Sequence, residues 1–501
     1  MASTTNPYKK ALNHTAIYGA ADILRKIVGF LMLPIYTRYL TPADYGVVEL
    51  MMMTIAIVEI VIGMRMGQAV FRYYSLAKDV NEKKSVMSTI FLMTLFASII
   101  AFIILATNAG SATKIMLGDT RYANLMAIFA FLLITQAVED FGLIYIKVHQ
   151  RALLFLLVNL SKFILQLSLN IYFIVYMNLS VAGIVYSACI STGTMSLFAI
   201  IYTFYYSGIR FSSSLAKQII IFSYPLWLAA LGTFYIDGAV RYFLRIFSGL
   251  DDVGIYSLAT KFAMLVIIFI WNPFVNIWSS LRYEIYDMEN PNRIYKNIFI
   301  ILMLAFSLVG LGLSLFSDTV IHVMSDKAYW AAASIVPILV MARIVQAMSQ
   351  FNNFGILVKG KTGIIAIGTY LNSIIITVAF LILIPLIGLR GAAVSTLIGF
   401  LLQLFWIEWR SKNLYNMDLP WRRVMALHLT WLACYLFSWL LPDSLLLSIA
   451  GKFIIYISFV LLIFVLPILK KEEKEQILYY TKIALKKGRS LLAPKRSESG
   501  L

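Results

Sequence analysis

The chain has 501 residues, of which 61% are hydrophobic and only 13% are charged, and its formal net charge is +18. Soluble domains carry about 25% charged residues, so this composition excludes a soluble globular protein. Only helices and closed barrels satisfy backbone hydrogen bonds in lipid, and the long apolar runs favour helices over short alternating barrel strands. The predicted fold class is therefore an all-α polytopic membrane protein.

Fourteen apolar segments follow one another along the chain, and each is long enough to span a membrane. These predicted spans are residues 12–36, 45–70, 86–107, 122–147, 153–177, 181–207, 218–247, 254–279, 296–317, 330–357, 363–386, 391–410, 422–441 and 448–469. The first ten residues are polar and the first span has full length, so we expect no cleavable signal sequence. An even number of spans places both ends of the chain on the same side.

Lysine and arginine are concentrated in the loops on one side of the predicted spans. The loops on the other side hold only Arg38, Lys114, Arg121, Lys327, Arg390 and Lys452. The positive-inside rule therefore predicts that the basic loops and both termini are cytoplasmic. The basic tail, residues 471–501, is expected to lie as an amphipathic helix on anionic lipid headgroups. This distribution explains the net charge without nucleic acid as a partner.

The chain contains an internal repeat. The segment Asp44-Tyr45-Gly46 matches Asp252-Val253-Gly254 at an offset of 208 residues, and Phe141-Gly142 matches Phe354-Gly355 at an offset of 213. Each copy has six spans, so the copies run in the same direction and should be related by an axis along the membrane normal. The predicted divisions are a six-helix bundle over 1–211, a second over 212–415, helices 13 and 14 over 416–470, and the tail over 471–501.

Charged residues lie inside the predicted spans. A charge at mid-membrane costs about 2.5–3.5 kcal/mol on insertion scales, so these side chains should face the bundle interior, pair, or reach the surface. The predicted substrate-binding residues of a central cavity are Arg25, Lys26, Lys162, Arg241, Lys261 and Arg343. The predicted gate or ion-coupling residues are Asp22, Arg65, Glu139 and Asp237. The excess of bases favours an anionic substrate.

Pairing within one helix is the alternative reading for several of these charges. Asp22 lies within one turn of both Arg25 and Lys26, and Asp237 lies four residues before Arg241, so each acid could neutralise a base on its own helix. One acid cannot neutralise two bases, and a positive charge is left over near Asp22.

Other charges have no such partner nearby. Lys162 and Arg343 have no acid within one turn, which makes them candidates for the cavity. Glu139 and Asp140 are adjacent and must point in different directions, so at most one should face the cavity. Arg65 could either reach the membrane surface or form an inner gate.

Several motifs and residue types that serve as functional sites in soluble enzymes do not indicate such sites in this sequence. The segment from Gly355 to Thr362 fits the P-loop pattern, but that motif needs a preceding strand, and here a membrane span precedes it. Cys189 and Cys434 lie in apolar segments and are interpreted as packing residues. The four histidines are scattered without metal-ligand spacing. We therefore expect no nucleotide, metal or other cofactor, and no enzymatic activity.

The order of several motifs resembles the polysaccharide transport family, which includes the Wzx-type flippases of O-antigen and exopolysaccharide in the multidrug/oligosaccharidyl-lipid/polysaccharide exporter superfamily. The residues that carry this resemblance are Leu33-Pro34-Ile35-Tyr36-Thr37-Arg38-Tyr39-Leu40-Thr41-Pro42-Ala43-Asp44-Tyr45-Gly46, Gln68-Ala69-Val70-Phe71-Arg72-Tyr73-Tyr74 and Gly254-Ile255-Tyr256-Ser257-Leu258-Ala259. The resemblance extends over the whole chain.

This resemblance implies a V-shaped pair of six-helix bundles that works by alternating access. It implies the outward movement of an undecaprenyl-diphosphate-linked glycan across the bacterial inner membrane. We expect a monomer that is surrounded by membrane lipids and acts with polysaccharide assembly proteins. In related precursor flippases a basic residue before Gly-Phe in span 1 lines the cavity, and Lys26 occupies that place.

Three alternative functions are compatible with these sequence features. A flippase for the lipid-linked peptidoglycan precursor and a multidrug/cation antiporter belong to the same superfamily. A membrane glycosyltransferase or polymerase would act on the same lipid, but it would need acidic catalytic residues in a sizeable loop. An antiporter for cations would be expected to depend on unpaired acids.

Overall fold

The computed structural model describes residues 30–63, 66–442, 444–470 and 473–475. All regular structure in these ranges is helical, which confirms the predicted fold class. The helices of the first part are α2 (Leu33–Tyr39), α3 (Pro42–Gly63), α4 (Gly67–Leu76), α5 (Val80–Thr107), α6 (Ala109–Leu117), α7 (Ala123–Phe129), α8 (Leu132–Val148), α9 (Ala152–Asn170), η1 (Ile171–Tyr176) and α10 (Ser180–Ser207).

The second part continues the helical pattern. It contains α11 (Ser213–Phe247), α12 (Leu250–Val266), η2 (Ile267–Trp271), α13 (Asn272–Tyr286), α14 (Pro291–Met324), η3 (Lys327–Ser334), α15 (Val336–Asn352), α16 (Phe354–Leu357), α17 (Gly363–Leu414), α18 (Trp421–Phe437), η4 (Ser438–Leu440) and α19 (Leu445–Val465). Most predicted spans coincide with one of these helices or with two consecutive ones.

Ten helices in the described ranges are long and apolar enough to cross a membrane, or up to eleven if one bent pair counts as a span. One of the ten, α17, covers the predicted spans 363–386 and 391–410 and has non-helical backbone at Ile387 and Gly388 between them. Gly388 has φ +55°, a conformation that glycine adopts without steric cost. The predicted span 12–36 lies mostly outside the described residues, so the number fourteen stays a prediction.

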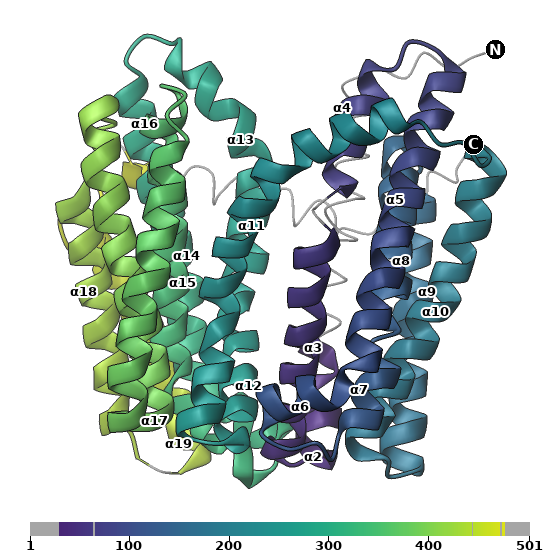
Figure 1. Ribbon diagram of the computed structural model, residues 1–501. Helices are drawn as coiled ribbons and strands as arrows, with labels where there is room; N and C mark the ends of the chain where they lie inside the picture. Colours follow the sequence, from purple (N-terminus) through teal and green to yellow (C-terminus); the bar gives the residue numbers. More distant parts are fainter. Residues whose placement is uncertain (1–29, 64–65, 443, 471–472, 476–501) are drawn as a thin grey trace, which may run out of the picture.

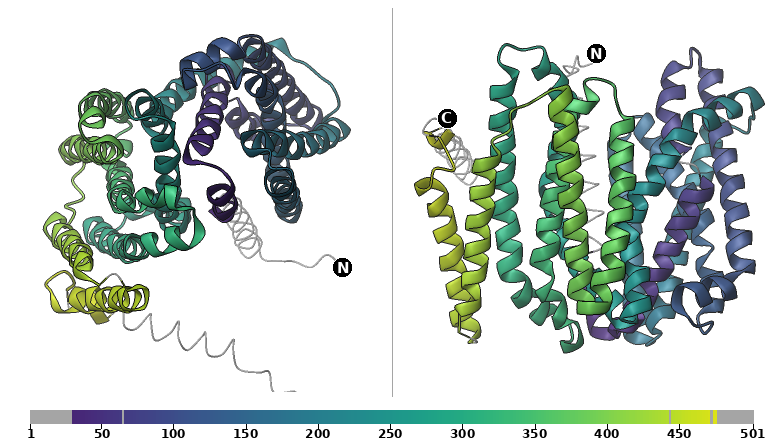
Figure 2. Two further views of the ribbon diagram at one scale, coloured as in Figure 1. Left: turned by 90° about the horizontal axis from the view of Figure 1, so that it is seen from below. Right: turned by 60° about the vertical axis from the view of Figure 1, so that its left-hand side comes forward.

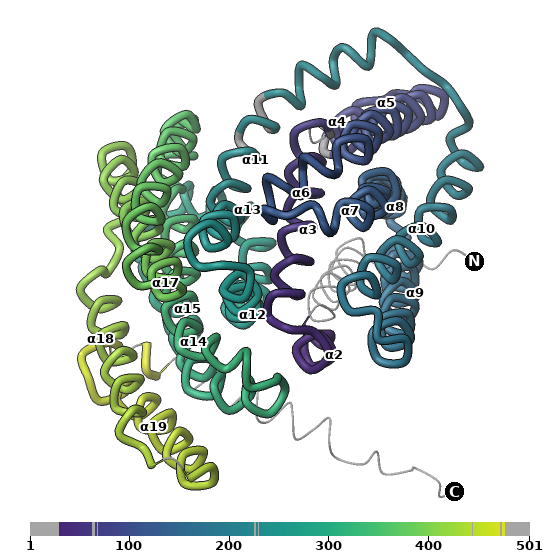
Figure 3. The backbone as a smooth tube through the Cα atoms, turned by 60° about the horizontal axis from the view of Figure 1, so that its bottom comes forward, coloured from purple at the N-terminus to yellow at the C-terminus, as the bar shows by residue number. Residues whose placement is uncertain are grey.

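The helices form two groups, and Figures 1 and 2 show them side by side. The first group contains α3, α5, α8, α9 and α10, and the second contains α12, α14, α15 and α17. Helices α18 and α19 lie on the outer flank of the second group and pack on α14. Helix α11 begins beside the first group and crosses to the second, as the tube in Figure 3 shows.

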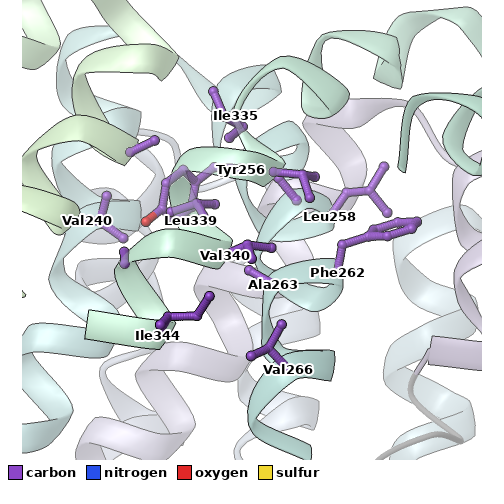
Figure 4. Close-up of a cluster of buried hydrophobic side chains, with 14 of the residues drawn as sticks. Val240, Tyr256, Leu258, Phe262, Ala263, Val266, Ile335, Leu339, Val340 and Ile344 are labelled. Atoms are coloured by element: carbon purple, nitrogen blue, oxygen red, sulfur yellow. The ribbon is translucent and has the colours of Figure 1, made fainter. Parts of the chain in front are cut away.

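The second group has a continuous apolar core. Figure 4 shows Ala263 and Val266 of α12 near Leu339, Val340 and Ile344 of α15. All five side chains are buried. This packing fixes the position of α15 against α12. It therefore also fixes the positions of the charged residues Lys261 on α12 and Arg343 on α15.

A capping box defines the start of α3. The amide of Asp44 donates to Oγ1 of Thr41 over 3.1 Å, and the amide of Thr41 donates to the Asp44 carboxylate over 3.4 Å. Pro42 stands at the first helical position, where its missing N–H costs nothing. The sequence Thr41-Pro42-Ala43-Asp44 is therefore a helix start, which places Gly46 one turn into α3.

The matched motifs of the repeat lie against each other where the two groups meet. A Cβ atom added at Gly46 of α3 would overlap the carbonyl oxygen of Leu250, and one added at Gly254 of α12 would overlap the carbonyl oxygen of Pro42. The two helices therefore cross with their backbones in contact, which only residues without a side chain permit. We call this contact the glycine crossing.

Polar contacts surround the glycine crossing. Nη2 of Arg38 donates to the carbonyl of Val323 over 2.9 Å, and the hydroxyl of Tyr329 donates to the carbonyl of Thr41 over 2.9 Å. The guanidinium of Arg245 on α11 lies against Gly118, which directly follows α6. These contacts close the end of the molecule that is opposite the basic loops, which is the lower end in Figure 1.

Candidate functional site

A buried ion cluster joins the two helix groups just inside the glycine crossing. Glu49 lies one turn after Gly46 on α3. Its carboxylate is 3.3 Å from Nη2 of Arg241 on α11 and 3.3 Å from Nζ of Lys261 on α12. The side chains of Glu49 and Arg241 are 8% and 10% exposed, whereas that of Lys261 is 38% exposed. One carboxylate of the first group thus holds two cations of the second.

Of the two readings of the Asp237–Arg241 spacing, the ion pair within one helix is not the one that the structure shows. Nη1 of Arg241 donates to the backbone carbonyl of Asp237 over 3.3 Å, and its Nε donates to Oγ of Ser257 over 3.0 Å. The carboxylate that Arg241 pairs with is Glu49. A buried carboxylate without a cation is costly, and no base on α3 lies within a turn of Glu49, so its partners come from other helices.

The carboxylate of Asp237 binds Arg343 instead. Nη1 of Arg343 on α15 is 2.7 Å from Oδ1 of Asp237 and 2.9 Å from Oε1 of Gln346. Arg343 is buried, while the Asp237 side chain is 43% exposed. Arg343 has no acid within a turn on its own helix, as predicted, and the structure supplies one from α11.

Lys162 belongs to a separate ion pair within the first group. Its Nζ on α9 is 2.6 Å from the carboxylate of Glu139 on α8. The neighbouring Asp140 lines a cavity of about 380 Å³ between α3, α5 and α8, together with Glu59. Glu139 and Asp140 therefore point in different directions, as predicted, and Lys162 is not part of the cluster around Glu49.

The charges of the central cluster do not cancel. Two carboxylates, Glu49 and Asp237, are shared by three cations, Arg241, Lys261 and Arg343. The most exposed members are Lys261 and Asp237, so an incoming ligand meets one base and one acid first. Because the cluster has one base in excess, it can bind an anion. Its cations then replace hydrogen bonds to Glu49 or Asp237 with hydrogen bonds to the ligand.

Four predicted site residues lie outside the described residues: Asp22, Arg25, Lys26 and Arg65. Their roles stay predictions. The P-loop-like segment lies between α15 and α17, two helices, with Gly355 inside α16. Within the described ranges, no group of three or more His, Cys, Asp and Glu side chains is placed to hold a metal ion.

The sequence reasoning missed Glu49 as a site residue. A signal was present, because Glu49 follows the matched motif by three residues and has no base within a turn on its helix. Such an acid in an apolar span must find its cation on another helix. Ser257 and Gln346 carried no comparable signal, since single polar residues in spans usually serve interhelical hydrogen bonds.

Comparisons with known proteins agree with this geometry. The family model for polysaccharide biosynthesis proteins matches residues 11–277. The lipid II flippase MurJ in its inward closed conformation is similar with a TM-score of 0.70 at 14% identity, over 90% of this chain and 98% of that one. An inward-facing multidrug resistance MATE family transporter of the MOP superfamily has a TM-score of 0.62 at 17% identity, over 78% and 95%. A search of curated proteins found no match.

The structural likenesses show the fold, which is the one shared by MurJ and the MATE transporters. The family match spans just over half of the chain and includes Glu49, Asp237, Arg241 and Lys261. It thus contains the glycine crossing and all of the central cluster except Arg343. The chain therefore belongs to the polysaccharide biosynthesis protein family, as a multi-pass membrane protein whose fold is similar to those of MurJ and the MATE transporters.

Proposed function

We propose that this protein is a flippase for an undecaprenyl-diphosphate-linked oligosaccharide, such as a repeat unit of O-antigen, capsule or exopolysaccharide. It moves this lipid from the cytoplasmic to the outer face of the bacterial inner membrane by alternating access, as a monomer with both termini in the cytoplasm. The observation that carries the proposal is the central cluster, in which three cations share two carboxylates between the two helix groups.

The diphosphate of such a lipid matches the excess base of the cluster. Phosphate oxygens accept charge-assisted hydrogen bonds from arginine and lysine, and these bonds are stronger away from bulk water. Lys261 is the accessible cation, and Arg343 can offer its remaining N–H groups once Asp237 is displaced. The lipid-linked glycan therefore binds with its diphosphate at Lys261 and Arg343.

Binding at Lys261 also explains how the two groups come to move. Glu49 links the first group to Arg241 and Lys261 of the second. When the diphosphate takes Lys261, the carboxylate keeps one cation instead of two, and the contact between the groups weakens. A ligand shifts a conformational equilibrium only by such differential contacts. The outward movement of about two negative charges gains roughly 2.3 kcal/mol per charge per 100 mV with a negative interior.

Accumulation of substrate in a deletion strain tests the proposal. A strain without the protein should accumulate a lipid-linked glycan on the cytoplasmic face, and mass spectrometry identifies it. That lipid should then cross liposome membranes that contain the purified protein. Transfer of the lipid-linked peptidoglycan precursor or of organic cations instead, with no transfer of the glycan lipid, would assign the protein to another branch of the superfamily.

A matched pair of lysine variants tests the site. Lys261→Ala removes the accessible cation of the cluster, whereas Lys361→Ala removes an exposed lysine in the turn before α17. We expect Lys261→Ala to reduce transfer of the glycan lipid at least tenfold and Lys361→Ala to leave it unchanged. Equal activity of the two variants in the liposome assay would contradict the site.

A further inference from the structure

A second, uncharged cavity lies next to the central cluster, inside the second helix group. It has a volume of about 170 Å³ and lies between α11, α15 and α17. Its polar lining includes Gln346, Ser349 and Gln350 of α15, Asn353 directly after α15, and Gln403 of α17. We call it the amide cavity. The residues that line it include no lysine, arginine, aspartate or glutamate.

The polar residues at the C-terminal end of α15, together with Asn353 directly after it, lie on one face of the helix. Gln346, Ser349, Gln350 and Asn353 are spaced by three, one and three residues, which aligns them on a single face over two turns. Polar side chains inside a membrane helix usually bond to a neighbouring helix. Here Oδ1 of Asn353 is buried and has no hydrogen-bond partner within the described ranges. A buried acceptor of this kind costs free energy until a ligand or water donates to it.

Neighbouring residues orient two of the amides. Oε1 of Gln346 accepts from Arg343 over 2.9 Å, and Oε1 of Gln403 accepts from Nδ2 of Asn372 over 3.1 Å. Their NH₂ groups are thereby left to act as donors at the cavity. The cavity thus offers oriented donors from Gln346 and Gln403, and the buried carbonyl of Asn353 in its wall lacks a donor within the described ranges.

This combination selects a neutral ligand with hydroxyl groups. A hydroxyl both donates and accepts, so it can satisfy amide N–H and C=O groups together. A phosphate would find no cation in the lining, and an alkyl chain would leave the amides unpaired. Ligand pockets for whole molecules measure about 300–1,000 Å³, so a cavity of about 170 Å³ admits one sugar residue rather than a full repeat unit.

We propose that the amide cavity binds one sugar residue of the transported glycan and contributes to the choice of substrate. The proposal rests on the proposed function, because it places the sugar beside a diphosphate at the central cluster. Gln346 provides the connection, since it lines the cavity and contacts Arg343, which holds Asp237. In the proposed lipid a neutral sugar directly follows the charged diphosphate. In the protein the neutral amide cavity directly adjoins the cationic central cluster, so the two arrangements match.

The test compares two lipids on the full-length protein in liposomes. The first is the lipid-linked glycan isolated from the deletion strain, and the second is undecaprenyl diphosphate without sugar. Gln350→Met and Asn353→Leu, alone and combined, remove hydrogen bonds with little change in side-chain size. Gln166→Met is the matched control, because Gln166 lies on α9 in the first group.

Each lost hydrogen bond should weaken binding of the glycan lipid about fivefold, and the double variant should weaken it about 10- to 30-fold. Binding of the bare diphosphate lipid should stay within twofold of wild type in all variants. Equal weakening of both lipids would overturn the sugar site and leave the proposed function standing. Failure of wild-type protein to bind or move either lipid would instead refute the proposed function.

A cross-linking measurement keeps the test decisive if the double variant is unstable. A photoreactive benzoylphenylalanine is placed at position 350 or, as a control, at position 166, and the glycan lipid carries a radiolabel in its sugar. Irradiation should attach label at position 350 and not at position 166. Labelling at neither position, with both proteins active in lipid transfer, would overturn the proposal.

Discussion

At the scale of single residues, Glu49 takes part both in the stability of the fold and in the conformational change that we propose. It compensates the buried Arg241 and also holds the more exposed Lys261. Removal of one partner from a buried ion pair leaves an uncompensated charge, which costs more than the pair itself contributes. Glu49 should therefore be sensitive to substitution both in the folded state and in transport.

We predict that Glu49→Ala destabilises the protein by about 3–5 kcal/mol, because Arg241 remains buried without a carboxylate. Thermal unfolding in detergent should show a lower Tm. Glu289→Ala, at an exposed acid between α13 and α14, is the control and should not change the Tm. The double variant Glu49→Ala with Arg241→Met should recover part of the loss. An unchanged Tm in Glu49→Ala would show that the pair contributes nothing.

Arg343 should tolerate lysine better than alanine but not fully. Its Nη1 serves both Asp237 and Gln346, and a lysine ammonium keeps the charge but loses the planar fork of donors. We predict that Arg343→Ala abolishes transfer of the glycan lipid and that Arg343→Lys restores about a tenth of it. Transfer is measured in liposomes, with Arg422→Ala, an exposed position on α18, as the control. Wild-type rates in Arg343→Ala would remove Arg343 from the site.

At the scale of helices, the glycine crossing determines how close α3 and α12 approach. Any side chain at Gly46 or Gly254 would meet backbone of the opposite helix, which cannot move aside as a side chain can. The close backbone contact therefore stabilises the conformation in which this end of the molecule is closed.

We predict that Gly46→Ala and Gly254→Ala shift the population towards the conformation that is open at this end, and reduce transfer at least tenfold. Spin labels on the two helix groups, measured by double electron–electron resonance, should report a longer distance across the crossing. Gly110→Ala is the control, because a Cβ there meets no atom within 4 Å. The same distance distribution in all three variants would refute this role.

At the scale of the whole molecule, alternating access requires that the contacts around the glycine crossing open in each cycle. Arg38 of α2, the helix that leads into α3 of the first group, contacts the backbone of Val323 on α14 of the second group. We predict that a short cross-linker between Arg38→Cys and Val323→Cys stops transfer, and that cleavage of the linker restores it. Lys359→Cys with Tyr286→Cys, which links two residues within the second group, should not affect transfer. Undiminished transfer with the first linker in place would exclude this movement.

Composition and the positions of apolar segments were enough to predict an all-α membrane protein, because the lipid imposes helices on any such sequence. The repeat motif also identified the residues of the glycine crossing, although it did not show that the two copies touch. Spacing along one helix could not reveal that Glu49 would take Arg241 away from Asp237, since that choice depends on how α3, α11 and α12 pack. The division at 212 and the two-fold relation of the copies stay predictions.

The glycine crossing gives the molecule the geometry of a lever with a short and a long arm. Gly46 lies near one end of α3, and the remaining length to Gly63 is about 25 Å at the helical rise of 1.5 Å per residue. A rotation of about 10° at this point moves the far end by roughly 4 Å, while the residues beside the pivot shift by less than the width of an atom. A rearrangement of Glu49 that turned α3 about the glycine crossing would therefore produce a larger movement at the basic end of the helix.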